Sequence, residues 1–143
     1  MAGICFFFES SDVDVWSGKN LDAWNYAMKC AGDIDKMIVI NRTPQHVQSP
    51  DTDVQCTVVN ELPILSNAVY FVGPNEQTET TISLWQFDHN VEWYCFGPAG
   101  GWKMINCRTV TIPQAGRGAL HAVHVASVVM FHRYAKMRAL WPQ

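Results

Sequence analysis

Short, continuous apolar segments are the feature that most limits how this chain of 143 residues can fold. Five of them are strand-like: GICFFFES (3–10), KMIVINRT (36–43), NAVYFVGPN (67–75), VEWYCF (91–96) and CRTVTIP (107–113). Their β-branched and aromatic residues favour strands, and their continuous apolar character is typical of strands that are buried on both faces. Such strands belong to parallel sheets that are covered by other elements.

Two segments have the periodicity of helices. In NLDAWNYAMKCAG (20–32) the apolar residues recur at the spacing of one helical face, and Gly32 is a suitable C-cap. The segment GALHAVHVASVVMFHRYAKMRALW (118–141) has a long helical pattern without an internal proline or glycine. Two further segments are ambiguous: VQCTVVNEL (54–62) fits a strand or a short helix, and TTISLWQF (80–87) fits a short helix or a turn.

Strands that alternate with helices predict an α/β fold with a mostly parallel sheet and flanking helices. Hydrophobic residues make up 48% of the chain and charged residues 16%, which is the composition of a folded protein rather than a disordered one. The chain contains no repeat, linker or low-complexity segment, so we expect residues 1–143 to form a single domain.

Cysteine usage and the first residues both favour a reduced, cytoplasmic location. The five cysteines are an odd number and include no CxxC pair, which argues against a zinc site or a disulfide framework. The start MAGICFFFESSD lacks the basic segment of a secretory signal, and no apolar run approaches the roughly 18 residues of a membrane span. We therefore expect no membrane association and no metal.

The charge balance bears on nucleic-acid binding. The formal net charge of −3 argues against indiscriminate binding of nucleic acids, which is usually accompanied by an overall basic composition. Basic residues nevertheless gather in the last quarter of the chain, where a local patch is possible: Arg108, Arg117, Arg133, Lys136 and Arg138.

Three of the predicted strands end in loops rich in glycine and proline, which read VGPN, FGPAGG and IPQAGRG. In open α/β sheets, ligands bind beyond the carboxyl ends of the strands, and glycine lets a ligand approach the backbone closely. Few charges lie between these loops, so they suit a flat heteroaromatic ring better than a phosphate. None of them matches GxGxxG or GxxxxGK[ST], which disfavours a dinucleotide site or a P-loop. Ordinary turn chemistry is the alternative for each loop taken alone.

The order and spacing of these loops resemble a known family. WYCFGPAGGW, followed by RTVTIPQAGRGALHAVHVASVVMFHRY, is similar to the C-terminal signature of SPOUT RNA methyltransferases in their SpoU/TrmH-like branch. That branch has an FGPE-x-x-G loop, then an IPM strand end, then an apolar helix. The resemblance covers residues 67–136 well and the first 45 residues only in the order of elements.

The resemblance implies a C-terminal trefoil knot, an S-adenosylmethionine cofactor held in it, and RNA (tRNA or rRNA) as the substrate. It also implies a homodimer that packs partly through the last helix, on which Val123, Ala126, Val129 and Met130 share one apolar side. Small residues such as Ala122, Ala126 and Ser127 would allow a close approach of helices. The resemblance further implies that the cofactor is held by loop residues, namely Val72, Gly73, Gly97, Pro98, Gly101, Ile112, Ala119 and Leu120.

Several positions differ from the family's pattern for 2′-O-methyltransferases. The first-helix pattern N-x-G-N-x-x-R-x-C-A places Asn25 on the second Asn but Met28 on the Arg, and no arginine occurs between positions 1 and 41. Ala99 stands where the FGPE loop has Glu, and His121 stands where Asn is usual.

Other polar residues near the predicted cofactor loops are therefore candidates for catalysis. Arg117 and His121 come first because they lie in the knot loop and at the start of the last helix. Lys19, Asn20 and Arg42 are further candidates. Alternatively, Arg117 contacts solvent or phosphate, and His121 and His124 are structural or interface histidines. The three-residue spacing of the two histidines is not that of a zinc motif.

The sequence is compatible with two main functions. The first is an S-adenosylmethionine-dependent methyltransferase that acts on RNA by 2′-O-ribose methylation or a related transfer. The second is a catalytically divergent SPOUT-like dimer that binds S-adenosylmethionine or RNA without turnover. A third hypothesis, an acceptor other than RNA, is slightly favoured by the acidic net charge.

Overall fold

The computed structural model describes residues 2–8, 22, 25–29, 34–41, 55–61, 63–72, 81–97, 108–112 and 122–138. Within them, no helix combines the length and the apolar character that crossing a membrane requires.

Seven strands form one sheet in the order β3-β2-β1-β6-β4-β7-β5, and every strand pair is parallel. The strands are β1 (Ala2–Phe8), β2 (Ile34–Asn41), β3 (Gln55–Val59), β4 (Ala68–Val72), β5 (Ile82–Ser83), β6 (Trp93–Phe96) and β7 (Arg108–Thr111). The predicted α/β fold with a parallel sheet is thus confirmed, and the ambiguous segment 54–62 contains a strand.

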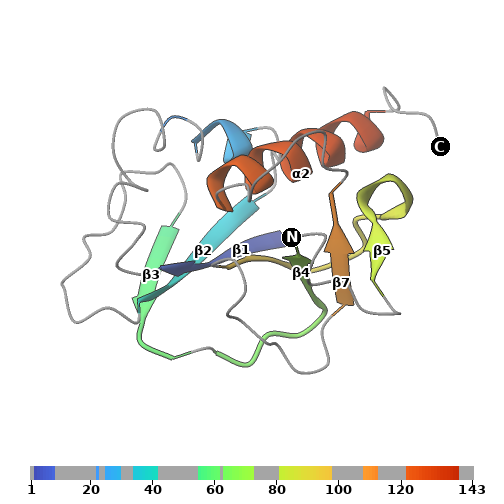
Figure 1. Cartoon of the computed structure of the whole chain (residues 1–143). Helices are drawn as coiled ribbons and strands as arrows, with labels where there is room; N and C mark the ends of the chain where they lie inside the picture. Colours follow the sequence, from blue (N-terminus) through green and yellow to red (C-terminus); the bar gives the residue numbers. More distant parts are fainter. Residues whose placement is uncertain are drawn as a thin grey trace.

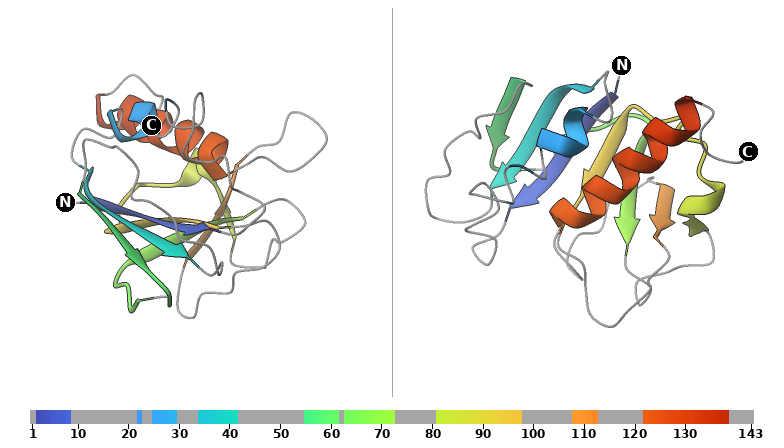
Figure 2. Two further views of the ribbon diagram at one scale, coloured as in Figure 1. Left: turned by 90° about the vertical axis from the view of Figure 1, so that its left-hand side faces the viewer. Right: turned by 90° about the horizontal axis from the view of Figure 1, so that it is seen from above.

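Helices cover one face of this sheet. The helix α2 (Ala122–Met137) and the helical residues 25–29 lie on the same face, and α2 crosses the central strands (Figures 1 and 2). A short 3-10 helix, η3 (Leu84–Gln86), follows β5 and begins at Ser83, whose hydroxyl accepts a hydrogen bond from the backbone N–H of Trp85. Segment 80–87 therefore contains both a two-residue strand and a helical turn.

Buried side chains alternate along the strands between two hydrophobic clusters. In β1, Ile4 and Phe6 belong to the cluster that includes residues of α2, whereas Cys5 belongs to a second cluster with Tyr70 and Trp93. Because both sets are apolar, the strands read as continuous apolar runs. Cys5 and Cys95 are buried in the second cluster, and burial raises the pKa of the half-buried Cys56 to about 11.

Phe71 is the centre of the aromatic packing beneath α2. Its ring stacks on Phe96 with centroids 5.1 Å apart and on Tyr94 at 6.1 Å, and it meets Phe87 edge-on at 6.0 Å. Offset stacking and edge-to-face contacts are the favourable geometries for aromatic pairs. Residues of β4, β6 and the segment after η3 are thereby fixed to one another.

One side of α2 faces this core. Ala126, Val129 and Met130 are each 0% exposed and pack in the cluster that contains Phe71. We expected this side of the helix to lie in a dimer interface, and that expectation is wrong for these three residues because they pack against their own sheet.

Gly3 allows β1 to pass beneath Trp93. A Cβ atom built on Gly3 would lie 2.7 Å from Cζ3 of Trp93 and 2.9 Å from Cγ of Lys36. The indole is rigid and 9% exposed, so it has little room to move. We expect Gly3→Ala to lower the free energy of unfolding by about 1–3 kcal/mol, the usual cost of overpacking. Urea unfolding measures this change, and an unchanged midpoint would contradict the close approach.

Candidate functional site

Three strand ends meet at one edge of the sheet. In the register of the sheet, Val72 of β4 pairs with Thr111 of β7, and Tyr70 pairs with Cys95 of β6. Continuing the second register by two residues brings Val72 level with Gly97. Because β6, β4 and β7 are adjacent and parallel, the loops that follow them leave from the same edge, as the sequence analysis expects (Figure 2).

This carboxyl edge is apolar at the described positions. Gly97 is half-buried, Ile112 is 8% exposed, and Phe96 lies buried just below the edge. One polar group is conspicuous there: the buried hydroxyl oxygen of Thr111 has no hydrogen-bond partner among the described residues. Such a hydroxyl can bond to a ligand that enters the edge.

Most other residues predicted for the site lie outside the described part of the chain. They are Gly73, Pro98, Gly101, Ala119 and Leu120 for the cofactor, and Arg117 and His121 for catalysis. Lys19, Asn20 and Arg42 lie outside it as well, as do the loops that would make the knot. The structure therefore brings together Val72, Gly97 and Ile112, and the roles of the others stay predictions.

The basic residues of the last quarter are largely engaged within the fold. Arg108 forms an ion pair with Asp88 at 3.6 Å and donates a hydrogen bond to the carbonyl of Asn90. Lys136 donates to the carbonyl of Phe87 at 2.9 Å, and Arg133 is 3% exposed above the ring of Tyr94. Arg108 and Lys136 thus hold the segment between η3 and β6, and Arg133 lies buried against β6.

A buried chain of polar groups lies near the opposite, amino edge. Nδ1 of His89 is 2.9 Å from the hydroxyl of Tyr94, and its Nε2 is 2.7 Å from Nδ1 of His132 on α2. His89 and His132 are 6% and 3% exposed, and Tyr94 is fully buried. His89 also has a positive φ of 58°, a backbone conformation that this packing must hold in place.

The surroundings keep both histidines neutral. Burial, together with the nearby charges of His132, Arg133 and Lys136, lowers the pKa of His89 to about 3, against a weaker opposing effect of Asp88. Burial and Lys136 also lower the pKa of His132. A hydrogen bond between two neutral imidazoles needs one donor and one acceptor nitrogen, which neutral tautomers supply.

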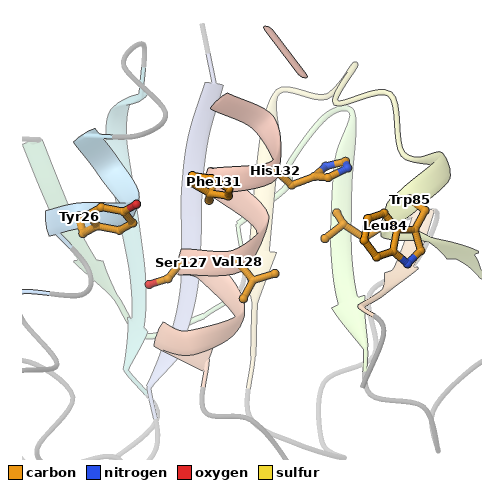
Figure 3. Close-up of a pocket in the computed structure, with 7 residues that line it drawn as sticks. All are labelled: Tyr26, Leu84, Trp85, Ser127, Val128, Phe131 and His132. Carbon is orange, nitrogen blue, oxygen red and sulfur yellow. The ribbon is translucent and has the colours of Figure 1, made fainter. Parts of the chain in front are cut away.

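The outer side of α2 carries an apolar surface, here called the α2 surface. It surrounds a hollow of about 400 Å³ and consists of Tyr26, Leu84, Trp85, Ser127, Val128, Phe131 and His132. Figure 3 shows Tyr26 on one side of the helix, Leu84 and Trp85 on the other, and Val128 and Phe131 on the helix itself. Four of these large side chains are about half exposed: Tyr26 51%, Trp85 55%, Val128 45% and Phe131 47%.

Sequence analysis did not single out His89, His132 or this surface. Positions 89 and 132 are 43 residues apart, and each histidine taken alone is an ordinary residue in its segment. The spacing of Val128 and Phe131 on a helix does indicate a shared side. The helix is apolar on more than one side, however, so periodicity could not tell which side faces the sheet.

Comparisons with known proteins show a relation in fold. No family model and no curated protein matches this sequence. Among solved structures, one that describes the 2-OH methylation of C/U34 on tRNA matches with a TM-score of 0.62 at 16% identity, over 96% of this chain and 97% of that one. The SpoU methyltransferase AviRb from Streptomyces viridochromogenes, in complex with AdoMet, matches with a TM-score of 0.63 at 15% identity.

A third match is an AdoMet-bound rRNA methyltransferase from Sinorhizobium meliloti, with a TM-score of 0.59 at 10% identity. The match with AviRb covers 96% of this chain and 60% of the AviRb chain. The match with the Sinorhizobium protein covers 99% of this chain and 57% of that one. The chain therefore has the fold of SpoU-type methyltransferases, and the resemblance read from the three loops is confirmed at the level of the fold.

Proposed function

We propose that the protein is an S-adenosylmethionine-dependent methyltransferase that acts on RNA. The observation that supports this most is the meeting of three apolar strand ends at one edge of a parallel sheet. The folds that match include two with AdoMet bound. One matching structure concerns methylation of tRNA, and another is an rRNA methyltransferase. At identities of 10–16% these matches support the substrate class by analogy of fold.

The residues at the edge suit this cofactor. Backbone groups at Val72, Gly97 and Ile112 would hold the adenine, together with Gly73, Pro98, Gly101, Ala119 and Leu120 of the loops. The apolar edge favours a neutral heteroaromatic ring, and the buried Thr111 hydroxyl can bond to a polar atom of the ligand. The cofactor supplies a methyl group on a sulfonium, and the chain contributes proximity and alignment.

For catalysis we propose Arg117 and His121. A ribose hydroxyl is a weak nucleophile, so methylation at the 2′-oxygen needs a group that takes or orients its proton. His121 could serve as that base at the start of the last helix, and Arg117 could bind the neighbouring phosphate. The Tyr94–His89–His132 chain does not serve this purpose, since Tyr94 lies in the amino half of β6 and Gly97 follows its carboxyl end.

We also propose a homodimer that packs through the last helix, by way of the α2 surface. Side chains of this size are seldom half exposed together around a hollow on a monomer, and such patches are typical of protein interfaces. The occupant we propose is a second copy, because an isologous contact lets Phe131 of each copy enter the hollow of the other.

Transfer of a labelled methyl group from S-adenosylmethionine to bulk tRNA or rRNA tests the proposed activity. We expect incorporation that is at least about 100-fold above a reaction without enzyme, and a fall of about tenfold or more for Arg117→Ala or His121→Ala. Clear cofactor binding without incorporation into any RNA would instead favour the non-catalytic binding dimer. Incorporation into another class of molecule would exclude RNA as the acceptor.

A further inference from the structure

The histidine pair lies directly beneath the α2 surface. His132 belongs both to the lining of the hollow and to the buried chain that continues through His89 to Tyr94. In Figure 3 the ring of His132 projects from α2 toward the side on which Leu84 lies. His132 itself is already 3% exposed, so anything that covers this surface acts on it by removing the solvent of the adjacent hollow.

The pair sits among groups that oppose its protonation. On α2, Arg133 and Lys136 are positively charged neighbours, and Lys136 is fixed by its hydrogen bond to the carbonyl of Phe87. In the segment before β6, Asp88 is the acidic neighbour, but it forms an ion pair with Arg108 of β7. The positive charges thus outnumber the negative one around the two imidazoles.

We propose that protonation of His132, the member of the His89–His132 pair that lines the hollow, separates two copies that associate through the α2 surface, so that the dimer dissociates in mild acid. This inference rests on the proposed dimer. In the dimer, a protonated His132 would have neither water nor an additional anion nearby. In the monomer, solvent lies close to it, so protonation costs less free energy.

The direction of the effect follows from proton linkage. If association lowers the pKa of His132 further, the affinity is complete above the pKa of the monomer and is lost as the pH falls below it. Each copy must release a proton to associate, so the dissociation constant rises by at most about 100-fold per pH unit, tenfold for each copy. Since burial already lowers the pKa of His132 from its usual value, affinity should be constant between about pH 7 and 8.

Sedimentation velocity over a concentration series gives the dissociation constant at each pH. For the unaltered chain we expect a rise of about tenfold or more between about pH 7.5 and pH 5 at constant ionic strength. His132→Gln keeps a neutral hydrogen-bonding group at this position, and its dissociation constant should change by less than about threefold. A pH-independent constant for the unaltered chain would overturn the inference, and so would a His132→Gln variant that responds to acid like the unaltered chain.

His124→Gln is the matched control. His124 is exposed on the same helix, so this variant removes one imidazole of α2 without touching the buried pair. It should dissociate in acid as the unaltered chain does. If it alone loses the response, the exposed histidine and not the pair is responsible, and the inference fails.

Folding must be followed in parallel, because acid also weakens the fold. The depressed pKa of His89 contributes stability that is present above the usual histidine pKa and is lost as the pH falls toward about 3. Near-UV circular dichroism should therefore be unchanged at every pH that is compared.

If His132→Gln does not fold, an NMR titration of the unaltered chain decides the question. The pKa of His132 should be lower in concentrated, dimeric samples than in dilute, monomeric ones, and equal values would overturn the inference. A monomer at about pH 7.5 and tens of micromolar would overturn the dimer and this inference together. A dimer of constant affinity would overturn this inference alone.

Discussion

The Gly97→Trp variant should lose detectable binding of S-adenosylhomocysteine, with a dissociation constant at least about 100-fold above that of the unaltered chain. Gly97 follows the last residue of β6, level with Val72, where the proposed adenine site needs close approach to the backbone. An indole at this position would fill the space of the ligand ring. Isothermal titration calorimetry measures the loss directly.

Glu92→Trp is the matched control for this variant. It places the same indole just before β6, at the other end of the same strand, where Glu92 is exposed and bonded to the hydroxyl of Ser66. This variant should bind the ligand as the unaltered chain does. Equal binding by both variants would move the ligand away from the carboxyl edge. A folded, unaltered chain that binds no S-adenosylhomocysteine at about millimolar concentration would remove the cofactor from the proposal.

Phe131→Asp should convert the proposed dimer into a monomer, with an increase of at least about 100-fold in the dissociation constant. Phe131 is 47% exposed, so the change is tolerated in the monomer, but an interface would enclose an unpaired carboxylate. Light scattering at tens of micromolar protein distinguishes the two masses. A dimer that survives this substitution would exclude the α2 surface as the contact.

Ile64→Asp controls for the general effect of a new surface charge. The side chain of Ile64 is 103% exposed in the loop before β4, and it does not belong to the α2 surface. The Ile64→Asp substitution, like Phe131→Asp, introduces a carboxylate in place of a large apolar side chain. The mass of the Ile64→Asp variant in light scattering should equal the dimeric mass of the unaltered chain.

The central strands β1, β4 and β6 were predictable because their side chains are buried on both faces of the sheet. Ile4 and Cys5 pack in different clusters on opposite faces of the sheet, so consecutive residues of the strand are both apolar. The segment 54–62 was ambiguous for a related reason, since β3 lies at the edge of the sheet and mixes polar with apolar residues. The order of the strands depends on long-range packing that single segments do not record.

Other features of the site could be read only from the three-dimensional structure. Periodicity predicts that α2 is helical, but Met130 and Phe131 are both apolar, and only the sheet decides that the first is buried and the second exposed. The contact between His89 and His132 depends on how α2 crosses the sheet. The common edge at which β4, β6 and β7 end was predictable because glycine and proline in the sequence mark the end of each strand.

The place of β1 in the sheet also has a consequence for how the chain assembles. Gly3 pairs with Lys36 of β2 on one side and with Trp93 of β6 on the other. Much of the chain must therefore emerge from the ribosome before β1 acquires its second neighbour. Contacts between residues so far apart in sequence close large loops, which slows folding relative to proteins with local contacts. Until β6 arrives, one edge of β1 is an open template for other chains, so we expect refolding at high protein concentration to compete with aggregation.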